Sequence, residues 1–243
     1  MWSSKLLKFS AAAVVSAGLI FAGPGGTAVG DAPAAAAHAA SVSPDDAMQR
    51  LRDGNGRFVA EKMTKSHQDA SRREELATGQ HPFAVVLGCA DSRVPPELVF
   101  DQGLGDLFVI RVAGEIASPD VIGSIEYAVE HLGCRTIIVL GHERCGAVDA
   151  ALHTPAGSVP EGNLGELLKD IQPAIAKIDP KAPDAMDAAV IANAKAVAAN
   201  LVTRSKELDE ASHKGDIVIT PARYDLETGK VEFFKPNAGA AGH

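Results

Sequence analysis

Short, almost continuous apolar runs recur along the chain between longer amphipathic stretches. The first three runs are Phe83–Gly88, Leu107–Ala113 and Thr136–Gly141. Runs of this length without polar alternation are typical of strands that are buried on both faces, as in parallel sheets. Two later runs, Asp216–Thr220 and Val231–Phe234, are joined by a segment with a Thr-Gly turn signal. That segment predicts a hairpin, so the last strand should run back along its neighbour.

Helical patterns lie before and between these runs. Ser43–Asp46 combines a capping hydroxyl, a proline in the first turn and two acids, which predicts the start of an N-terminal helix. Strands that alternate with helices predict an α/β fold, here an open, mostly parallel β-sheet flanked by helices, with a C-terminal hairpin strand and an N-terminal helical arm. The further predicted helices are Ala70–Ala77, Pro119–Leu132, Cys145–His153, Leu164–Ile178 and Asp184–Ala211.

The first 40 residues have the composition of a targeting segment. Lys5 and Lys8 precede an apolar run, Phe9–Ala22, and small residues follow it. The run is shorter than the roughly 20 residues that a membrane span needs. We therefore expect 1–40 to be a signal peptide and small-residue leader, and 41–243 to be a single domain that is exported to the periplasm or secreted without a stable membrane anchor. An uncleaved anchor or a disordered tail is the alternative.

Composition narrows the class of protein. Hydrophobic residues make up 46% and charged residues 22%, which indicates a folded globular chain. The 23 Lys+Arg and 31 Asp+Glu give a formal net charge of −8, and no basic patch of the kind that binds nucleic acid is evident. We therefore expect no nucleic-acid partner. Three cysteines are too few for a disulfide-stapled scaffold, so each is interpreted by its position.

Two clusters of metal-ligand residue types follow predicted strands. Cys89-Ala-Asp-Ser-Arg93 comes after the first strand, and Gly141-His-Glu-Arg-Cys-Gly146 comes at the end of the third. Because ligands bind at the carboxyl ends of strands in an open α/β sheet, both clusters should project from the same edge. Two thiolates and one imidazole suit Zn²⁺. We predict metal ligation by Cys89, His142 and Cys145, with a structural zinc site or a disulfide between the two cysteines as alternatives.

The third cysteine, Cys134, lies in a Gly-Cys-Arg turn before a strand. Most free cysteines in such positions are small buried hydrophobes rather than ligands. We therefore predict that Cys134 is a structural free thiol.

Asp91 and Arg93 decide whether such a metal site is catalytic. Two residues apart, they can form a charge-assisted, bidentate pair. A carboxylate can also take a fourth place on zinc, so Asp91 is a predicted metal ligand as well. When Asp91 faces Arg93 instead, water can occupy the vacated position, and zinc lowers the pKa of that water into the neutral range. Asp91 and Arg93 are therefore the predicted catalytic residues.

Together the two motifs are similar to the paired signature of β-class carbonic anhydrases, and the resemblance runs from about Ser43 to Phe234. It implies one zinc ion per chain, with Asp91 either a fourth ligand in a closed state or the partner of Arg93 in an open state. The implied reaction is the reversible hydration of carbon dioxide to bicarbonate and a proton. A same-fold hydrolase of carbon disulfide or carbonyl sulfide is the alternative enzyme. An exported, non-catalytic thiol/disulfide protein is the alternative of a different class.

Further positions match the family pattern: Gln80, Phe108, Tyr127 and Gly146. The resemblance implies that such residues bind substrate in a small, largely apolar pocket, some of them from across a subunit interface. Gln80 would bind substrate or bicarbonate through its side-chain amide, and the two aromatic rings would form walls of the pocket. Glu115 departs from the pattern, since the family often has Asn there. An acid at this position would alter the electrostatics near the metal or the loop conformation.

We expect an even assembly, a homodimer or a homotetramer. The resemblance places pocket residues at an interface between subunits. On the predicted N-terminal helix, Leu51 and Phe58 also form an apolar stripe ahead of the α/β core, which we expect to lie at such an interface.

Overall fold

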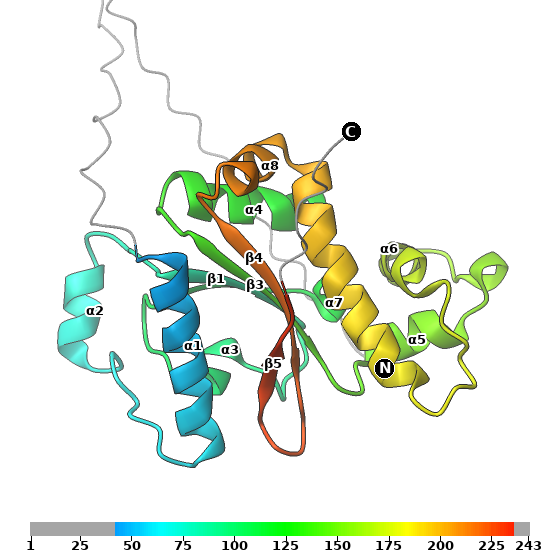
Figure 1. The fold of residues 1–243 in the computed structure, drawn as a ribbon, viewed down its shortest axis with the longest axis horizontal. Coiled ribbons are helices and arrows are strands. Elements are labelled where there is room, and N and C mark those ends of the chain that lie inside the picture. The colour runs from blue at the N-terminus through cyan, green and yellow to red at the C-terminus, as the bar shows by residue number, and fades with distance from the viewer. Residues whose placement is uncertain (1–41, 236–243) are drawn as a thin grey trace, which may run out of the picture. The chain divides into compact units, whose positions relative to one another are not determined.

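The computed structural model of the chain describes residues 42–235. The predicted signal peptide and leader lie outside the described residues, so export and cleavage stay predictions. Five strands form one sheet in the order β2-β1-β3-β4-β5 (Figure 1). All neighbouring pairs are parallel except β4 and β5, which form the predicted antiparallel hairpin. The strands are β1 (Ala84–Gly88), β2 (Leu107–Arg111), β3 (Thr136–His142), β4 (Val218–Tyr224) and β5 (Val231–Phe233).

Helices cover both faces of this sheet. α4, α7 and α8 lie over one face, α1 and α3 lie over the other, and α5 and α6 form a third cluster with α7 (Figure 1). The helices are α1 (Pro44–Val59), α2 (Ala70–Leu76), α3 (Pro96–Val99), α4 (Pro119–Glu130), α5 (Gly146–His153), α6 (Asn163–Ile175), α7 (Ala185–Arg204) and α8 (Lys206–His213), with 3₁₀ turns η1 (Ala113–Glu115) and η2 (Ala156–Ser158). The predicted α/β fold is confirmed.

Burial on both faces explains the apolar runs. Along β1, Val85 and Leu87 contribute to the core under α4 and α7, whereas Ala84 and Val86 contribute to the core under α1 and α3. Every residue of β1 and β3 is buried. These two central strands therefore form a rigid support for whatever follows their carboxyl ends.

The predicted single helix from Asp184 to Ala211 is wrong, because the structure breaks it at Ser205. Ser205 has extended backbone angles, and its hydroxyl accepts a hydrogen bond from the Leu208 N–H, so it ends α7 and caps α8. The same hydroxyl donates to Glu126 of α4 at 2.6 Å. Serine favours helix N-caps over helix interiors, and this was the sequence signal for the break.

The predicted fourth strand ended too early, because β4 continues through Pro221 to Tyr224. The Pro221 carbonyl accepts a hydrogen bond from the Phe234 N–H, which follows β5. Because the nitrogen and the carbonyl of one strand residue point to the same side, the Pro221 nitrogen also faces the β5 side. Pairing with β5 starts only at Ala222. The missing N–H of proline therefore removes no hydrogen bond to β3.

The expected interface stripe on α1 is also corrected. Leu51 is fully buried in the core that this chain forms itself, against residues of α3 and the sheet. Phe58 is partly buried against the same core, with its ring 6.5 Å from that of Tyr224. The stripe belongs to the fold of the single chain and carries no argument for an assembly.

One helix among the described residues, α7, is long and apolar enough to cross a membrane by length and composition alone. Ala194, Val197 and Leu201 of this helix are buried in the core over the sheet, so we interpret α7 as a core helix.

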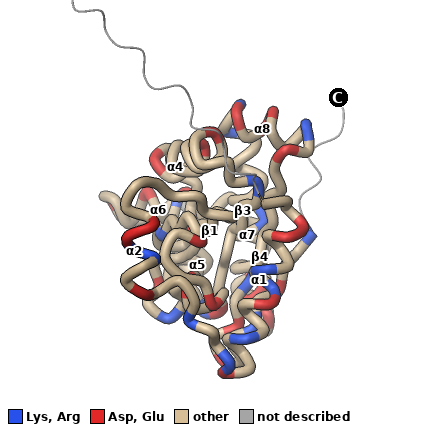
Figure 2. The backbone as a smooth tube through the Cα atoms, turned by 90° about the vertical axis from the view of Figure 1, so that its left-hand side faces the viewer, with Lys and Arg blue, Asp and Glu red and all other residues tan. Residues whose placement is uncertain are grey.

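In the view of Figure 2, basic and acidic positions are interspersed along the chain. That nucleic acid is no partner stays a prediction.

Candidate metal centre

Three buried side chains converge at the carboxyl edge of the sheet. Cys89 follows β1, His142 is the last residue of β3, and Cys145 is the N-cap of α5. One ligand atom from each lies within 4.8 Å of the other two. Between His142 and Cys145 the chain turns at Arg144, whose φ of 49° is left-handed. This tight turn brings the imidazole and the second thiol to the same point.

The two thiols are free rather than bonded to each other. The Cys89 and Cys145 sulfurs are 3.9 Å apart, whereas a disulfide requires about 2.05 Å. The remaining thiol, Cys134, is buried elsewhere and its Sγ donates to the Pro82 carbonyl at 3.2 Å. Burial raises the pKa of Cys134 to about 12, which suits the predicted structural thiol.

His142 presents one ring nitrogen to this group. Its Nδ1 lies 2.8 Å from the Glu143 carbonyl oxygen, which fixes the proton on Nδ1. Its Nε2 is fully buried and has no hydrogen-bond partner. A buried, unpaired imidazole nitrogen beside two thiols is costly in a protein without an ion. The donor set therefore fits a metal ion of the kind that prefers sulfur and nitrogen ligands.

The contact between the two thiols changes the pKa of both. The hydrogen bond shared by the Cys89 and Cys145 sulfurs lowers the pKa of Cys89 to about 4, against the opposing effect of burial. The same bond, together with burial, raises the pKa of Cys145. The shared bond therefore favours the thiolate form of one of the two sulfurs, the form that binds metals.

The predicted pair of Asp91 and Arg93 is present beside this group. Arg93 Nε and Nη2 donate to the two Asp91 carboxylate oxygens at 2.9 and 2.7 Å. These hydrogen bonds hold the pKa of Asp91 well below its usual range. Asp91 Oδ2 lies 3.8 Å from His142 Nε2, but its oxygens are not among the atoms of the 4.8 Å group. The structure therefore shows Asp91 turned toward Arg93.

Arg111, which sequence reasoning missed, holds the loop that carries these residues. At the end of β2, its guanidinium donates to the backbone carbonyl of Cys89 at 3.0 Å and to that of Asp91. In the sequence, the only indication of this role is that Arg111 is a single arginine at the end of an apolar strand. Its role depends on the pairing of β2 with β1, which a local pattern does not reveal.

The four predicted substrate-binding residues are not gathered at the metal ligands. Gln80 is exposed and precedes β1, whereas Cys89 follows that strand, which spans about 16 Å. Phe108 pairs with Val85 near the start of β1, and the ring of Tyr127 lies 6.4 Å from that of Phe108. These three residues lie toward the opposite edge of the sheet.

The fourth, Gly146, is the one that adjoins the ligands. It is exposed at the first position of α5, directly after Cys145, and a Cβ added there would meet no atom within 4 Å. Of the four, Gly146 alone is placed at the metal group within this chain.

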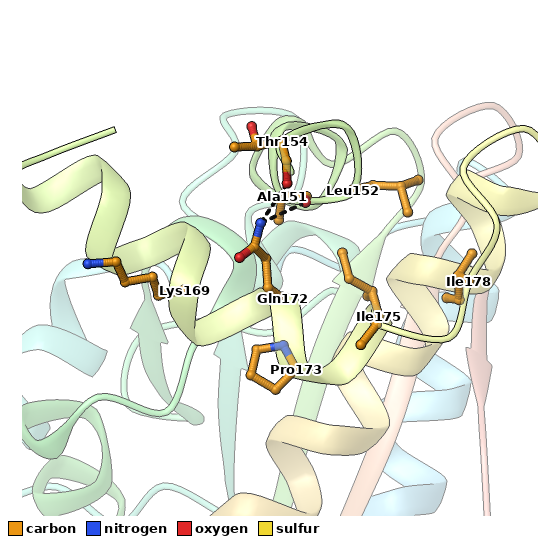
Figure 3. A pocket seen from close by; sticks show the side chains of 9 residues that line it. Ala151, Leu152, Thr154, Lys169, Gln172, Pro173, Ile175 and Ile178 are labelled. Carbon is orange, nitrogen blue, oxygen red and sulfur yellow. Dashed lines mark hydrogen bonds between the residues drawn. The ribbon is translucent and has the colours of Figure 1, made fainter. Parts of the chain in front are cut away.

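A pocket of about 480 Å³ between α5 and α6 is a separate feature (Figure 3). Gln172 of α6 spans this contact, donating to the carbonyls of Ala151 and Thr154 at the end of α5. Cys145 lies at the other end of α5, about 12 Å of helix away. The pocket holds none of the three metal ligands.

Comparisons with known proteins agree with this geometry. Residues 84–231 match the family model for carbonic anhydrase. Carbonic anhydrase 2 of Mycobacterium tuberculosis is 39% identical over 191 residues, which is 78% of this chain and 92% of the relative. A carbonic anhydrase of Mycolicibacterium smegmatis is 40% identical over 191 residues, or 78% of this chain and 93% of the relative.

Solved structures give the class. The β-carbonic anhydrase CcaA is 32% identical with a TM-score of 0.61, over 77% of this chain and 87% of that one. A Coccomyxa β-carbonic anhydrase solved with acetazolamide is 28% identical with a TM-score of 0.62, over 83% and 90% of the two chains. Sequence identity, coverage and fold agree, and the chain belongs to the β-class of the carbonic anhydrase family.

Proposed function

We propose that this chain catalyses the reversible hydration of carbon dioxide to bicarbonate and a proton, at one zinc ion held by Cys89, His142 and Cys145. One observation carries the proposal: two thiols and an unpaired imidazole nitrogen, all buried, meet within 4.8 Å at the carboxyl edge of the sheet. Membership of the carbonic anhydrase family supports the same reaction. The adjacent pair of Asp91 and Arg93 supports a catalytic rather than a structural site.

Each residue near the proposed zinc site has a separate role in this reaction. Zinc, when bound, lowers the pKa of water so that a nucleophile for carbon dioxide is available near neutral pH. Asp91 accepts a hydrogen bond from that nucleophile and orients it toward the carbon. Arg93 keeps Asp91 ionised and turned away from the three ligands. The Glu143 carbonyl holds the His142 ring so that Nε2 faces the thiols.

Zinc content measured beside the rate of carbon dioxide hydration tests this proposal. We expect about one zinc per purified chain, and we expect Cys145→Ala to lose both zinc and activity because a buried ligand is removed. Cys134→Ala is the matched control, since it removes an equally buried thiol that contacts Pro82 instead of the ligands. It should keep both zinc and rate.

Full zinc and full rate in Cys145→Ala would show that the ligand assignment is wrong. A wild-type chain that holds zinc but does not hydrate carbon dioxide would refute the function. Carbon disulfide and carbonyl sulfide, assayed in parallel, would then show whether the site serves the alternative hydrolysis.

We also propose that the active form is a homodimer joined along β2. Among residues 42–235, β2 pairs on one side only, with β1, so it is the edge strand of the sheet. Its residues Leu107 to Ile110 are apolar yet only partly buried, and Leu104 and Tyr127 nearby are 45% and 47% exposed. An apolar edge strand with free backbone groups favours pairing with a second copy.

Such a dimer would also complete the substrate pocket. Two edge strands related by a two-fold axis run antiparallel, so the start of one lies beside the end of the other. The end of β2 adjoins the metal group, because Arg111 contacts the Cys89 carbonyl. The partner's Phe108 and the partner's Tyr127 would then approach this chain's metal edge.

A further inference from the structure

A left-handed turn in η1 lies beside the Cys89 sulfur. Gly114 and Glu115 have φ values of 68° and 40°, and the Gly114 N–H donates to Cys89 Sγ at 3.4 Å. A glutamate rarely adopts positive φ, so this conformation persists only where surrounding contacts impose it. A Cβ on Gly114 would come within 2.7 Å of Ile171 Cδ1. The positive φ and this close approach favour glycine here, and its N–H is directed at a proposed metal ligand.

Asn193 of α7 holds this turn from the opposite side. Its Nδ2 donates to the Gly114 carbonyl at 2.9 Å and to Glu115 Oε1 at 3.0 Å. Asn193 and Glu115 are 1% and 0% exposed. A Cβ on Gly141 would lie 3.2 Å from Glu115 Oε1, so the glutamate also lies against the residue before His142. The two side chains thus connect α7 to η1, which donates to Cys89, and to the end of β3, which carries His142.

Glu115 fits this place as a neutral group. Burial is the main cause that raises the pKa of Glu115 well above its usual range. Its Oε2 is buried and has no partner, which a charged carboxylate would tolerate poorly. A neutral acid can still accept from Asn193 and adds no negative charge beside two sulfur ligands.

We propose that Glu115 and Asn193 are positioning residues for the metal site: together they hold the Gly114 N–H against the Cys89 sulfur and so fix the geometry and electron donation of that ligand. The inference rests on the proposed function, since it concerns ligation by Cys89. Residues that hold a metal ligand in place through hydrogen bonds typically contribute about 10–100-fold to metal affinity. The pair should act on metal retention as well as on activity.

Zinc release and the spectrum of the cobalt(II)-substituted protein test the proposal on the full chain. We expect zinc-loaded Asn193→Ala to lose its metal to excess chelator about 10-fold faster than wild type. The thiolate-to-cobalt charge-transfer band should move to lower energy, because the sulfur loses a hydrogen-bond donor. Glu115→Ala should behave in the same way. Glu115→Gln keeps an oxygen acceptor for Asn193 and should restore both values to near those of wild type.

Asn55→Ala is the matched control for a role in folding alone. Asn55 is also buried, and its Nδ2 donates to the carbonyls of Val99 and Gly229, neither of which bonds to Cys89, His142 or Cys145. Its replacement should lower the melting temperature while leaving the zinc-release rate and the cobalt band unchanged. If Asn193→Ala does not fold, Asn193→Leu, which is closer in shape, replaces it.

The outcomes separate this proposal from the function. If wild type binds no zinc, both proposals fail. If wild type binds zinc and the Asn193 variant releases it at the wild-type rate with an unshifted band, the positioning role alone is refuted. The positioning role is also refuted if Asn55→Ala changes the release rate and the band as much as Asn193→Ala does.

Discussion

The Asp91 carboxylate is paired with the Arg93 guanidinium, and an ion held by Cys89, His142 and Cys145 would be a second cation within its reach. In the structure it faces Arg93, with Oδ2 2.7 Å from Nη2 and 3.8 Å from His142 Nε2. The Arg93 side chain is 51% exposed, so water screens the pair and weakens it. A pair of modest strength can open, so with zinc bound at the proposed site the position of Asp91 would depend on a balance between two cations.

Removing Arg93 should shift this balance toward the metal. In Arg93→Ala the Asp91 carboxylate loses both of its side-chain donors, and we expect it to ligate a zinc ion held by the three residues and to exclude the nucleophile. We expect zinc to stay near one per chain while kcat/KM for carbon dioxide falls about 100-fold, as for a misplaced reacting group. Asp91→Ala should also keep zinc and be slow, because three ligands remain but the orienting oxygen is lost.

Arg73→Ala provides the control for loss of a positive charge, since Arg73 is exposed on α2. Its zinc content and rate should match those of wild type. An undiminished rate of Arg93→Ala across the neutral and mildly alkaline range would refute the role of the pair and leave the zinc assignment untouched.

At the scale of elements, the end of α1 and the end of α3 are joined through one buried carboxylate. Asp101 follows α3 with a left-handed φ of 45°. Its Oδ2 accepts from Arg57 Nε at 2.6 Å and from the backbone and hydroxyl of Thr64 at 2.9 Å. Its Oδ1 accepts from Lys65 N–H at 3.1 Å. The carboxylate therefore fixes the end of α1 and the segment after it against the end of α3.

The free energy of unfolding should depend on pH because of Asp101, which joins the ends of α1 and α3. Burial alone would raise the pKa of Asp101, but the bonds from Arg57, Thr64 and Lys65 outweigh it and lower the pKa to about 2. A folded-state pKa below the unfolded value of about 3.9 stabilises the fold above pH 4, and this contribution is lost as pH falls toward 2. The shift corresponds to about 2 kcal/mol.

Urea unfolding of wild type and Asp101→Asn between pH 2 and 7 measures this contribution. The variant should be less stable at pH 7, and the difference between the two proteins should shrink as the pH falls. A difference that stays constant down to pH 2 would show that the carboxylate does not titrate with folding.

Elements and ligands could be predicted from the sequence because their signals are local. Ser43 accepts from Asp46 N–H as the capping pattern of α1 predicted, and the apolar runs marked the central strands. The ligand motifs follow those strands directly, so the convergence of Cys89, His142 and Cys145 followed from parallel topology.

The supporting residues could not be predicted, because their roles arise from packing between distant segments. Asn193 lies within a long helical pattern, and only the rotation of α7 against η1 directs its amide at Gly114. Arg111 has the pattern of a polar strand end until the register of β2 with β1 places it on the Cys89 loop. A sequence pattern shows the periodicity of a helix or strand, but it does not show how that element is rotated or which element it packs against.

At the scale of the whole molecule, the proposed dimer makes activity depend on association. Gln80 and Phe108 lie about a strand's length from the metal group of their own chain, so they could act on substrate only in the site of another chain. A monomer would then hold zinc but lack part of its pocket. Metal content and activity should separate when the interface is broken.

A lysine in the middle of β2 should break this interface. Val109 lies at the centre of the strand, paired with Val86 of β1 and only partly buried, and a charge on an edge strand opposes pairing with another strand. We expect Val109→Lys to sediment as a monomer at concentrations well below micromolar, to keep about one zinc per chain, and to lose about 10-fold or more in hydration rate because the partner's side of the pocket is missing. Leu164→Lys is the matched control, since it places the same charge on a leucine of α6 that is 63% exposed and lies away from β2. That variant should stay dimeric and active. A Val109→Lys protein that is monomeric yet fully active would show that one chain builds a complete pocket, and a wild-type chain that is itself a fully active monomer would refute the dimer.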